Sequence, residues 1–435
     1  MTDKAKYHLS GIAGSGMNPL AQALLAEGHP VTGSDRYFDR GEDLPIIRKL
    51  QALGVKFFAQ DGSGISGDCS GLVISTAIES DNPEILTARQ HGIPQLHRSE
   101  MLAQLVENKT TIAIAGTSGK TTTTGMVGYA LEQLNLDPNV INGGVIVNWA
   151  DDQCIGNVRS GKSDTWVIEA DESDRSLLNY TPEWAIINTI SIDHFDLEET
   201  IELFRLFAAK VKKGIVCGPG VSRHLQGATE ASLIELSGNP TDFQLHMPGR
   251  HNQVNAIATA TLCEAITGDR SLVQEALSSF QGIERRLQNL GGGAVTVYDD
   301  FGHNPEKIRA AIEATRPDNH RLFLGWKPHG YGPLKNMADE LVRMLSTYSP
   351  DSISVHILPV YYVGGTTNPT MHSEDFVELL SAAGVNAHFA PNYEELRAVW
   401  TTEAKAGDIC LSMGARDPEL PRFARRVARQ MEDSK

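Results

Sequence analysis

The chain has 435 residues, 41% of them hydrophobic and 21% charged, which is typical of a soluble globular protein with two or three domains. Its formal net charge of −16 argues against a protein that binds nucleic acid or anionic membranes in general. The N-terminus has no apolar signal core, no apolar run reaches the roughly 18 residues of a membrane span, and the five cysteines lie far apart. We therefore expect a cytoplasmic protein with reduced thiols and no nucleic-acid or membrane partner.

Residues 1–107 alternate short apolar runs with helical patterns, which favours a parallel sheet covered by helices. Residues 6–28, KYHLSGIAGSGMNPLAQALLAEG, predict a strand, a glycine turn and a helix, and residues 30–35 predict a second strand that ends in Asp35. The glycines are spaced GxxGxG and not GxGxxG, yet Asp35 follows about 20 residues later, as a ribose-binding acid would. The turn therefore indicates a nucleotide-like ligand. A turn that only allows close helix–strand packing is the alternative.

Residues 108–285 begin with an apolar run that leads into a Gly-Lys-Thr turn, IAIAGTSGKTTTT at 112–124. Glycines let backbone N–H groups surround an anion, and a helix that begins near Lys120 adds the positive end of its dipole. Lys120 would then reach the β- and γ-phosphates of a nucleotide, and the Thr121 hydroxyl would bind Mg²⁺. Ile114 stands where the general pattern has glycine, so a tight turn with a solvent-facing lysine is the alternative. The strand before the turn and the helix after it favour the phosphate site.

Polar side chains follow two further predicted strands of this region. Glu169 and Asp171 come after one apolar run, and Asn188, Asp193 and His194 come after the next. Ligands of open parallel sheets lie beyond the carboxyl ends of the strands, so these residues could share one Mg²⁺–nucleotide site with the Gly-Lys-Thr turn. Taken singly, the histidine could be an ordinary turn residue and the acids a solvated loop.

The last third of the chain repeats the strand-and-helix pattern after three glycines at 291–293, which suggest a linker or turn. A polar turn and a helix follow the first strand. Strands are predicted within 294–314, 321–326, 353–360 and 408–415. We therefore expect three α/β domains, over residues 1–107, 108–285 and 286–435.

With these features in place, the chain resembles the Mur ligase family of peptidoglycan synthesis nearly from end to end. The motifs that carry the resemblance follow the family's order: GIAGSGM with GSD, AGTSGKTTTT, EADESDRSLL, INTISIDHFD, GRHNQVNAIA, FQGIERRLQ and DDFGHNP. The resemblance implies a Rossmann-like N-terminal domain that holds a UDP-sugar, a central P-loop ATPase domain, and a Rossmann-like C-terminal domain that closes over an amino acid.

The activity implied by the resemblance is an ATP- and Mg²⁺-dependent ligase that forms an amide bond through an acyl phosphate. Its substrates would be the carboxylate of UDP-N-acetylmuramate and the amine of an amino acid, with L-alanine favoured, in a monomer or homodimer. The near alternative is a ligase for the recycled peptide L-alanyl-γ-D-glutamyl-meso-diaminopimelate. A non-catalytic nucleotide-binding regulator on the same scaffold is another. A P-loop kinase or plain ATPase would leave the first glycine turn and the third domain without a role.

Roles for individual residues are also implied by the resemblance. The ATP-binding residues would be Gly116, Thr117, Ser118, Gly119, Lys120, Thr121, Thr122, Asn252, Arg286 and Asp299. Mg²⁺ would be held by Thr121, Glu169 and His194. The UDP moiety would face Gly14, Ser15, Gly16, Met17 and Asp35. The catalytic residues would be Lys120, His194, Arg286 and His303.

The sequence also departs from the family's motifs. The family's Thr-His before Gly-Lys is Thr117-Ser118, and the two adjacent histidines common in the C-terminal motif are His303-Asn304. Residues 328–332 read PHGYG without the expected arginine, and 414–417 read GARD in place of GAGD. Lys210 lies too far along the chain to match the carbamylated lysine of some relatives. Because most departures fall in the predicted amino-acid-binding domain, the acceptor is the part that the sequence leaves open.

Overall fold

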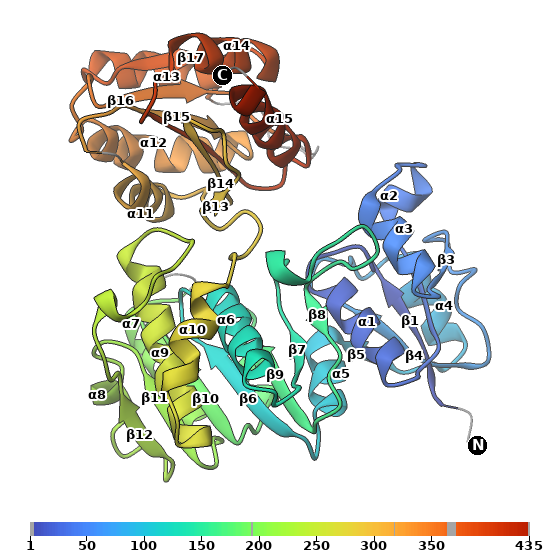
Figure 1. The fold of residues 1–435 in the computed structure, drawn as a ribbon. Helices are drawn as coiled ribbons and strands as arrows, with labels where there is room; N and C mark the ends of the chain where they lie inside the picture. Colours follow the sequence, from blue (N-terminus) through green and yellow to red (C-terminus); the bar gives the residue numbers. More distant parts are fainter. Residues whose placement is uncertain (1–3, 193–194, 317, 363–370, 434–435) are drawn as a thin grey trace. The chain divides into compact units, whose positions relative to one another are not determined.

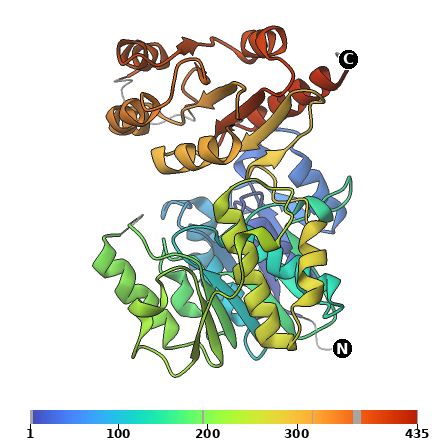
Figure 2. The same cartoon turned by 60° about the vertical axis from the view of Figure 1, so that its left-hand side comes forward.

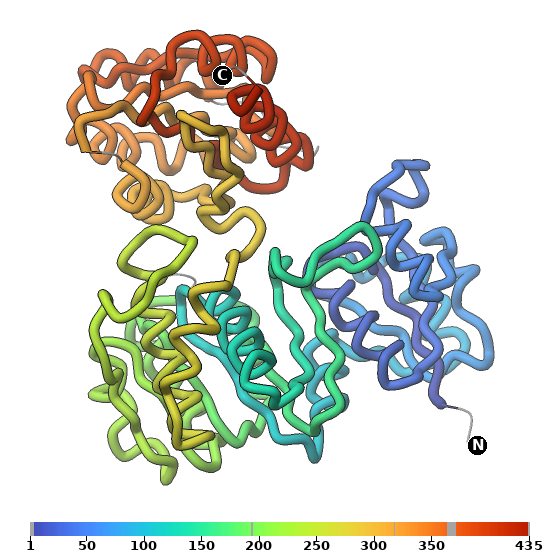
Figure 3. The backbone as a smooth tube through the Cα atoms, viewed as in Figure 1, coloured from blue at the N-terminus to red at the C-terminus, as the bar shows by residue number. Residues whose placement is uncertain are grey.

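The structure, a computed structural model, describes residues 4–192, 195–316, 318–362 and 371–433. The chain divides into two compact units: Met1–Leu245 with Gln253–Gln281, and His246–Asn252 with Gly282–Lys435. The first unit contains two β-sheets and the second contains one, and Figure 3 follows the backbone through them in sequence order. No helix among the described residues has the length and apolar character needed to cross a bilayer.

The first sheet is parallel throughout, with strand order β3-β2-β1-β4-β5 (Figure 1). Its strands are β1 (Lys6–Ser10), β2 (Val31–Ser34), β3 (Lys56–Phe58), β4 (Cys69–Ile74) and β5 (Gln95–His97). Its helices are α1 (Met17–Ala26), α2 (Arg36–Asp39), α3 (Pro45–Ala52), α4 (Pro83–Gln90) and α5 (Arg98–Leu105). The predicted strand, glycine turn and helix are confirmed, because β1 ends at Ser10 and α1 begins at Met17.

The second sheet has the order β12-β11-β10-β6-β9-β7-β8 and is parallel except for the β7–β8 pair. Its strands are β6 (Thr110–Ala115), β7 (Asn139–Ile141), β8 (Val158–Arg159), β9 (Thr165–Glu169), β10 (Trp184–Ile187), β11 (Gly214–Cys217) and β12 (Ser232–Glu235). The helices of this part are α6 (Lys120–Gln133), α7 (Leu197–Ala208), α8 (Ser222–Leu225), α9 (Arg250–Thr267) and α10 (Ser271–Ser278), with 3₁₀ turns η1 (Val147–Trp149), η2 (Ser176–Asn179) and η3 (Pro240–Asp242). Helices α6, α9 and α10 lie along one face of the sheet in Figures 1 and 2.

The third sheet has the order β13-β14-β18-β15-β16-β17 and is parallel except for the β13–β14 pair. Its strands are β13 (Gln288–Asn289), β14 (Thr296–Asp300), β15 (Leu322–Lys327), β16 (Ile353–Ile357), β17 (Ala387–Phe389) and β18 (Ile409–Gly414). Its helices are α11 (Pro305–Thr315), α12 (Tyr331–Leu345), α13 (Ser373–Ala382), α14 (Tyr393–Glu403) and α15 (Glu419–Asp433). Three mostly parallel sheets with helices confirm the predicted α/β fold class.

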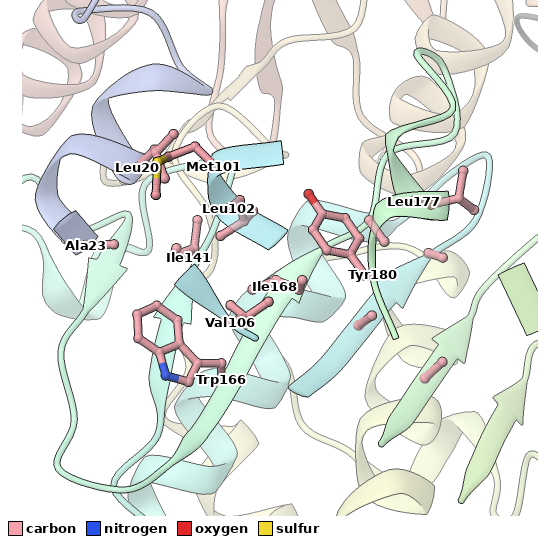
Figure 4. Packing of buried hydrophobic residues seen from close by; sticks show 14 of the residues in the cluster. Leu20, Ala23, Met101, Leu102, Val106, Ile141, Trp166, Ile168, Leu177 and Tyr180 are labelled. Atoms are coloured by element: carbon pink, nitrogen blue, oxygen red, sulfur yellow. The ribbon is translucent and has the colours of Figure 1, made fainter. Parts of the chain in front are cut away.

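One apolar core joins the first two sheets. Figure 4 shows Met101 beside Leu20 of α1, while Val106, which follows α5, lies over Trp166 and Ile168 of β9. All five side chains are at most 7% exposed. Helix α5 therefore packs between the two sheets, and removing this shared apolar surface from water stabilises them as one unit.

A fully buried polar cluster ties helix α4 to the ends of β1 and β2. The His8 ring lies 2.8 Å from Thr32 Oγ1 and 2.8 Å from Glu84 Oε1. Glu84 Oε2 accepts hydrogen bonds from the hydroxyls of Ser10 and Ser34. Burial raises the pKa of Glu84, but the hydrogen bond and charge of His8 and the two hydroxyls outweigh it, so the net pKa lies below the ordinary 4.5.

We expect Glu84→Gln to lower the free energy of unfolding by about 3 kcal/mol at pH 7, because it leaves a buried partner unpaired. The native carboxylate contributes stability above its unfolded pKa of 4.5, and that contribution is lost as pH falls through the lower folded pKa. Urea unfolding at pH 7 and pH 3.5 measures both effects, with the exposed Glu79→Gln as the control. An equal loss of unfolding free energy in Glu84→Gln at both pH values would contradict a stabilising role for the ionised Glu84 carboxylate.

Candidate active site

The turn between β6 and α6 has the geometry of an anion cradle. Gly116 and Gly119 have φ values of 130° and 83°, which side chains other than glycine rarely adopt. A Cβ at Gly116 would lie 2.9 Å from the Thr189 nitrogen, and one at Gly119 would lie 2.9 Å from the side chains of Asn188 and Asn255. Both positions therefore require glycine for a close approach as well as for backbone conformation.

The loop after β10 supports this turn. The Thr117 N–H donates to the Thr189 carbonyl at 3.0 Å, and the Ser118 N–H donates to the Thr189 hydroxyl at 3.0 Å. The Thr117 hydroxyl lies 2.8 Å from that of Ser191. Asn188, a candidate from the sequence, is buried and donates to the Thr123 hydroxyl at 2.9 Å, so it braces α6. The Thr122 side chain is also buried within α6.

Lys120 begins α6 and lies over the turn. Its ammonium group donates to the Gly116 carbonyl at 2.9 Å and to Glu172 Oε2 at 2.6 Å, and it lies 3.8 Å from Asp171 Oδ1. Burial raises the pKa of Asp171, but the Lys120 charge and the Ser173 hydrogen bonds outweigh it and hold this pKa below its usual value. Two carboxylates thus hold the lysine, and phosphate oxygens in the turn would compete with them for it.

The candidate metal ligands are Thr121, in the first turn of α6, and Glu169, the last residue of β9. Glu169 Oε2 accepts a hydrogen bond from the Gly143 N–H at 2.8 Å. His194, predicted as the third ligand, lies outside the described residues, as does Asp193. Within the described part of the chain, no group of three or more His, Cys, Asp or Glu side chains could hold a metal by itself. Hydroxyl and carboxylate oxygens suit Mg²⁺, which in phosphate sites takes one or two protein ligands together with phosphate and water.

The first glycine turn lies beyond the carboxyl end of β1. Gly14, Ser15 and Gly16 are exposed, whereas the Met17 side chain is 3% exposed and belongs to the core. Asp35 is 4% exposed, and its two oxygens accept from the Ala13 and Tyr37 N–H groups at 3.0 Å each.

Asp35 therefore closes the turn and caps α2. Burial raises its pKa above the ordinary value, although these N–H groups and Arg36 oppose the rise. The structure thus gives Asp35 a supporting position, and its contact with the UDP moiety stays a prediction.

The second compact unit contains the remaining predicted residues. Asp299 is 1% exposed and lies 3.3 Å from Arg285 Nε, while Arg286 lies over the Phe301 ring at 5.6 Å. Burial raises the pKa of Asp299 to about 6, although Arg285 opposes this rise. Asn252, in the first turn of α9, is 3% exposed and donates to the Pro248 carbonyl at 2.7 Å. Contacts of these residues with a nucleotide stay predictions.

His303 follows β14 and is held as a neutral ring. Burial is the main cause that lowers its pKa to about 4. Its Nδ1 lies 3.1 Å from the Phe301 carbonyl, which only accepts hydrogen bonds, so Nδ1 carries the proton and Nε2 keeps a lone pair. The ring meets that of His329 edge to face, with centroids 4.9 Å apart. His303 is therefore neutral at pH 7, with Nε2 free of a proton and able to accept a hydrogen bond.

Comparisons with known proteins show to which family the chain belongs. Three family models match the chain: "Mur ligase family, catalytic domain" over residues 6–110, "Mur ligase middle domain" over 114–218, and "Mur ligase, glutamate ligase domain" over 285–416. The chain is 32% identical over 445 residues to the UDP-N-acetylmuramate–L-alanine ligase of Sulfurihydrogenibium sp. (strain YO3AOP1), with 94% of each chain covered.

The chain belongs to the Mur ligase family. Another relative of the same name, from Chelativorans sp. (strain BNC1), is 32% identical over 453 residues and also covers 94% of each chain. Mur ligases are ATP-dependent enzymes that form amide bonds.

Solved structures share the fold of this Mur ligase. The UDP-N-acetylmuramate–alanine ligase of Thermotoga maritima matches with a TM-score of 0.78 at 24% identity, covering 99% of this chain and all of the other. A murein peptide ligase of Psychrobacter arcticus 273-4 matches with a TM-score of 0.65 at 20% identity, covering 99% of each chain. A MurF ligase of Thermotoga maritima in complex with ADP matches with a TM-score of 0.56 at 15% identity, covering 84% of this chain and 90% of the other.

Sequence reasoning missed several residues that hold the site of this Mur ligase together. Glu172, bonded to Lys120, stands within the EADESD stretch, where the end of the apolar run points to Glu169 and Asp171. Its burial was the missing signal, since a pattern of acids alone does not tell which carboxylate turns inward. Arg98 belongs to no motif, and only the fold brings it to Asp174.

Proposed function

We propose that this Mur ligase joins the carboxylate of UDP-N-acetylmuramate to the amine of an amino acid, with L-alanine favoured, and uses ATP in peptidoglycan synthesis. The observation that carries the proposal is the match of nearly the whole chain to enzymes named for that reaction. The glycine cradle with Lys120 supports the ATP-dependent part. A cytoplasmic location belongs to the same proposal.

The chemistry follows from the poor reactivity of a carboxylate toward an amine. One carboxylate oxygen attacks the γ-phosphorus of ATP, the bond from that phosphorus to the β-bridging oxygen breaks, and ADP leaves. The amine nitrogen then attacks the carbonyl carbon of the acyl phosphate, and phosphate departs with the oxygen that came from the carboxylate. The amine loses a proton as the amide forms.

The residues of this chain act mainly by positioning and by offsetting charge. The backbone N–H groups of residues 119–122, at the start of α6, cradle the phosphates, and Lys120 moves from its carboxylate partners to the phosphate oxygens. Thr121 and Glu169, with His194 as the predicted third ligand, would hold Mg²⁺, which supplies further positive charge at the phosphates. Arg286 and His303 belong to the second compact unit, and their roles as a cation for the phosphates and as a base for the amine stay predictions.

An acceptor screen tests this function. The protein is supplied with UDP-N-acetylmuramate, ATP and Mg²⁺, and ADP release and coupled product are measured with each amino acid and with the tripeptide L-alanyl-γ-D-glutamyl-meso-diaminopimelate. We expect acceptor-dependent ADP release and an amide product, greatest with L-alanine. Preference for the tripeptide would overturn the proposed acceptor. ATP binding without a product for any acceptor would favour a regulator and contradict ligase activity.

A further inference from the structure

Arg98 stands at the junction between the first two sheets. It is the first residue of α5, which begins directly after β5 and is capped by His97 and Glu100. Its side chain is 25% exposed, so the guanidinium group is largely enclosed by the protein. Nη2 lies 3.2 Å from Asp174 Oδ2 and 3.9 Å from Asp171 Oδ2, and both acids belong to the loop that follows β9. Arg98, at the start of the helix that follows the first sheet, thus holds the acidic loop that follows β9 of the second sheet.

The same side chain packs against the first glycine turn. A Cβ built on Gly16 would lie 3.3 Å from Cδ and Nε of Arg98 and 3.5 Å from Cζ. The stem and guanidinium group of Arg98 therefore cover the Gly16 backbone, and the absence of a side chain at residue 16 allows this approach. Arg98 therefore contacts the exposed turn directly at Gly16.

Asp171 also connects Arg98 with the phosphate turn. Its Oδ2 lies 3.9 Å from Arg98 Nη2, and its Oδ1 lies 3.8 Å from Lys120 Nζ. The Asp171 carboxylate is therefore shared by Arg98, which contacts the glycine turn after β1, and Lys120, which lies over the glycine turn after β6. If phosphate oxygens draw Lys120 away, Arg98 is the cation that remains paired with Asp171 among the described residues.

We propose that Arg98 is a positioning residue that couples the UDP-sugar turn to the ATP turn through Asp171. With a nucleotide on Lys120, Asp171 and Asp174 hold Arg98 firmly against Gly16, and the turn is fixed for the UDP-sugar. Thermodynamic reciprocity requires the converse, because a UDP-sugar that stabilises this position of Arg98 weakens the hold of Asp171 on Lys120. The inference rests on the proposed function for the identity of the two ligands.

Calorimetric titration of UDP-N-acetylmuramate into the full chain tests the coupling, with and without a non-hydrolysable ATP analogue and Mg²⁺. We expect the analogue to tighten UDP-sugar binding by about tenfold in the unaltered protein and by less than about twofold in Arg98→Ala. Arg98→Lys, which keeps the charge, should restore part of the coupling. A residue that only stabilised the fold would not change this ratio, and thermal unfolding checks that each variant is folded.

The matched control is Arg89→Ala, which removes an exposed arginine of the neighbouring helix α4 and should leave the tenfold coupling intact. Coupling that persists in Arg98→Ala, or that is absent from the unaltered protein while both ligands bind, overturns the role of Arg98 and leaves the ligase proposal standing. An unaltered protein that binds no UDP-N-acetylmuramate overturns the proposed function, and this inference with it.

Discussion

Replacing Lys120 by alanine is expected to lower kcat by about 1,000-fold or more while UDP-N-acetylmuramate still binds, at least as tightly as it binds the unaltered protein without nucleotide. The loss follows because Lys120 is the cation that lies over the glycine cradle, 2.9 Å from the Gly116 carbonyl, where phosphate charge must be offset. Binding survives because the proposed UDP-sugar turn belongs to another sheet. Steady-state ADP release and calorimetric titration measure the two quantities separately.

The control for this experiment is Lys212→Ala. Lys212 is 52% exposed and pairs with Glu183 at 3.0 Å. The substitution therefore removes the same charge as Lys120→Ala without changing the glycine cradle. Its kcat should stay within about twofold of the unaltered protein, since exposed pairs contribute little. A Lys120→Ala enzyme that keeps more than about a tenth of its activity would refute the phosphate role. Loss of both activity and UDP-sugar binding would indicate misfolding and would also contradict the predicted separation.

Replacing Glu169 by glutamine is expected to lower kcat at fixed Mg²⁺ by about 100-fold. The substitution keeps the shape of the side chain and an oxygen that can accept from the Gly143 N–H, but it removes the negative charge that suits a divalent cation. Raising the Mg²⁺ concentration should recover part of the rate. Titration of Mg²⁺ into the protein with the ATP analogue bound measures the affinity directly.

Glu230→Gln is the matched control for Glu169, because Glu230 is exposed and precedes β12. Its Mg²⁺ dependence should equal that of the unaltered protein. If Glu169→Gln loses activity with an unchanged Mg²⁺ affinity, Glu169 supports the fold through Gly143 and is not a metal ligand.

The strands and the phosphate turn could be predicted from the sequence because their signals are local. The apolar run at 110–115 predicts a buried strand, and glycines followed by lysine and threonines predict a turn into a helix. Since parallel strands end at one edge of a sheet, the same patterns predict the positions of Glu169, the last residue of β9, and of Asn188, the first residue after β10.

The partners of these residues could not be predicted, because they depend on tertiary packing. Asn188 stands where a ligand would be expected, yet its side chain turns to Thr123. Asp299 is one of two adjacent acids at the end of β14, yet its side chain is buried against Arg285. Arg98 and Asp174 are 76 residues apart, and only the packing of α5 between two sheets brings them together. Such pairs need the three-dimensional structure.

The central claim is that ATP phosphorylates the donor carboxylate within this protein. UDP-N-acetylmuramate labelled with ¹⁸O in both carboxylate oxygens tests it, with the preferred acceptor present and the released phosphate analysed by mass spectrometry. We predict that each phosphate carries one ¹⁸O atom, because the carboxylate oxygen that attacks the γ-phosphorus leaves with it. Release of unlabelled phosphate alongside amide product would contradict the acyl-phosphate route.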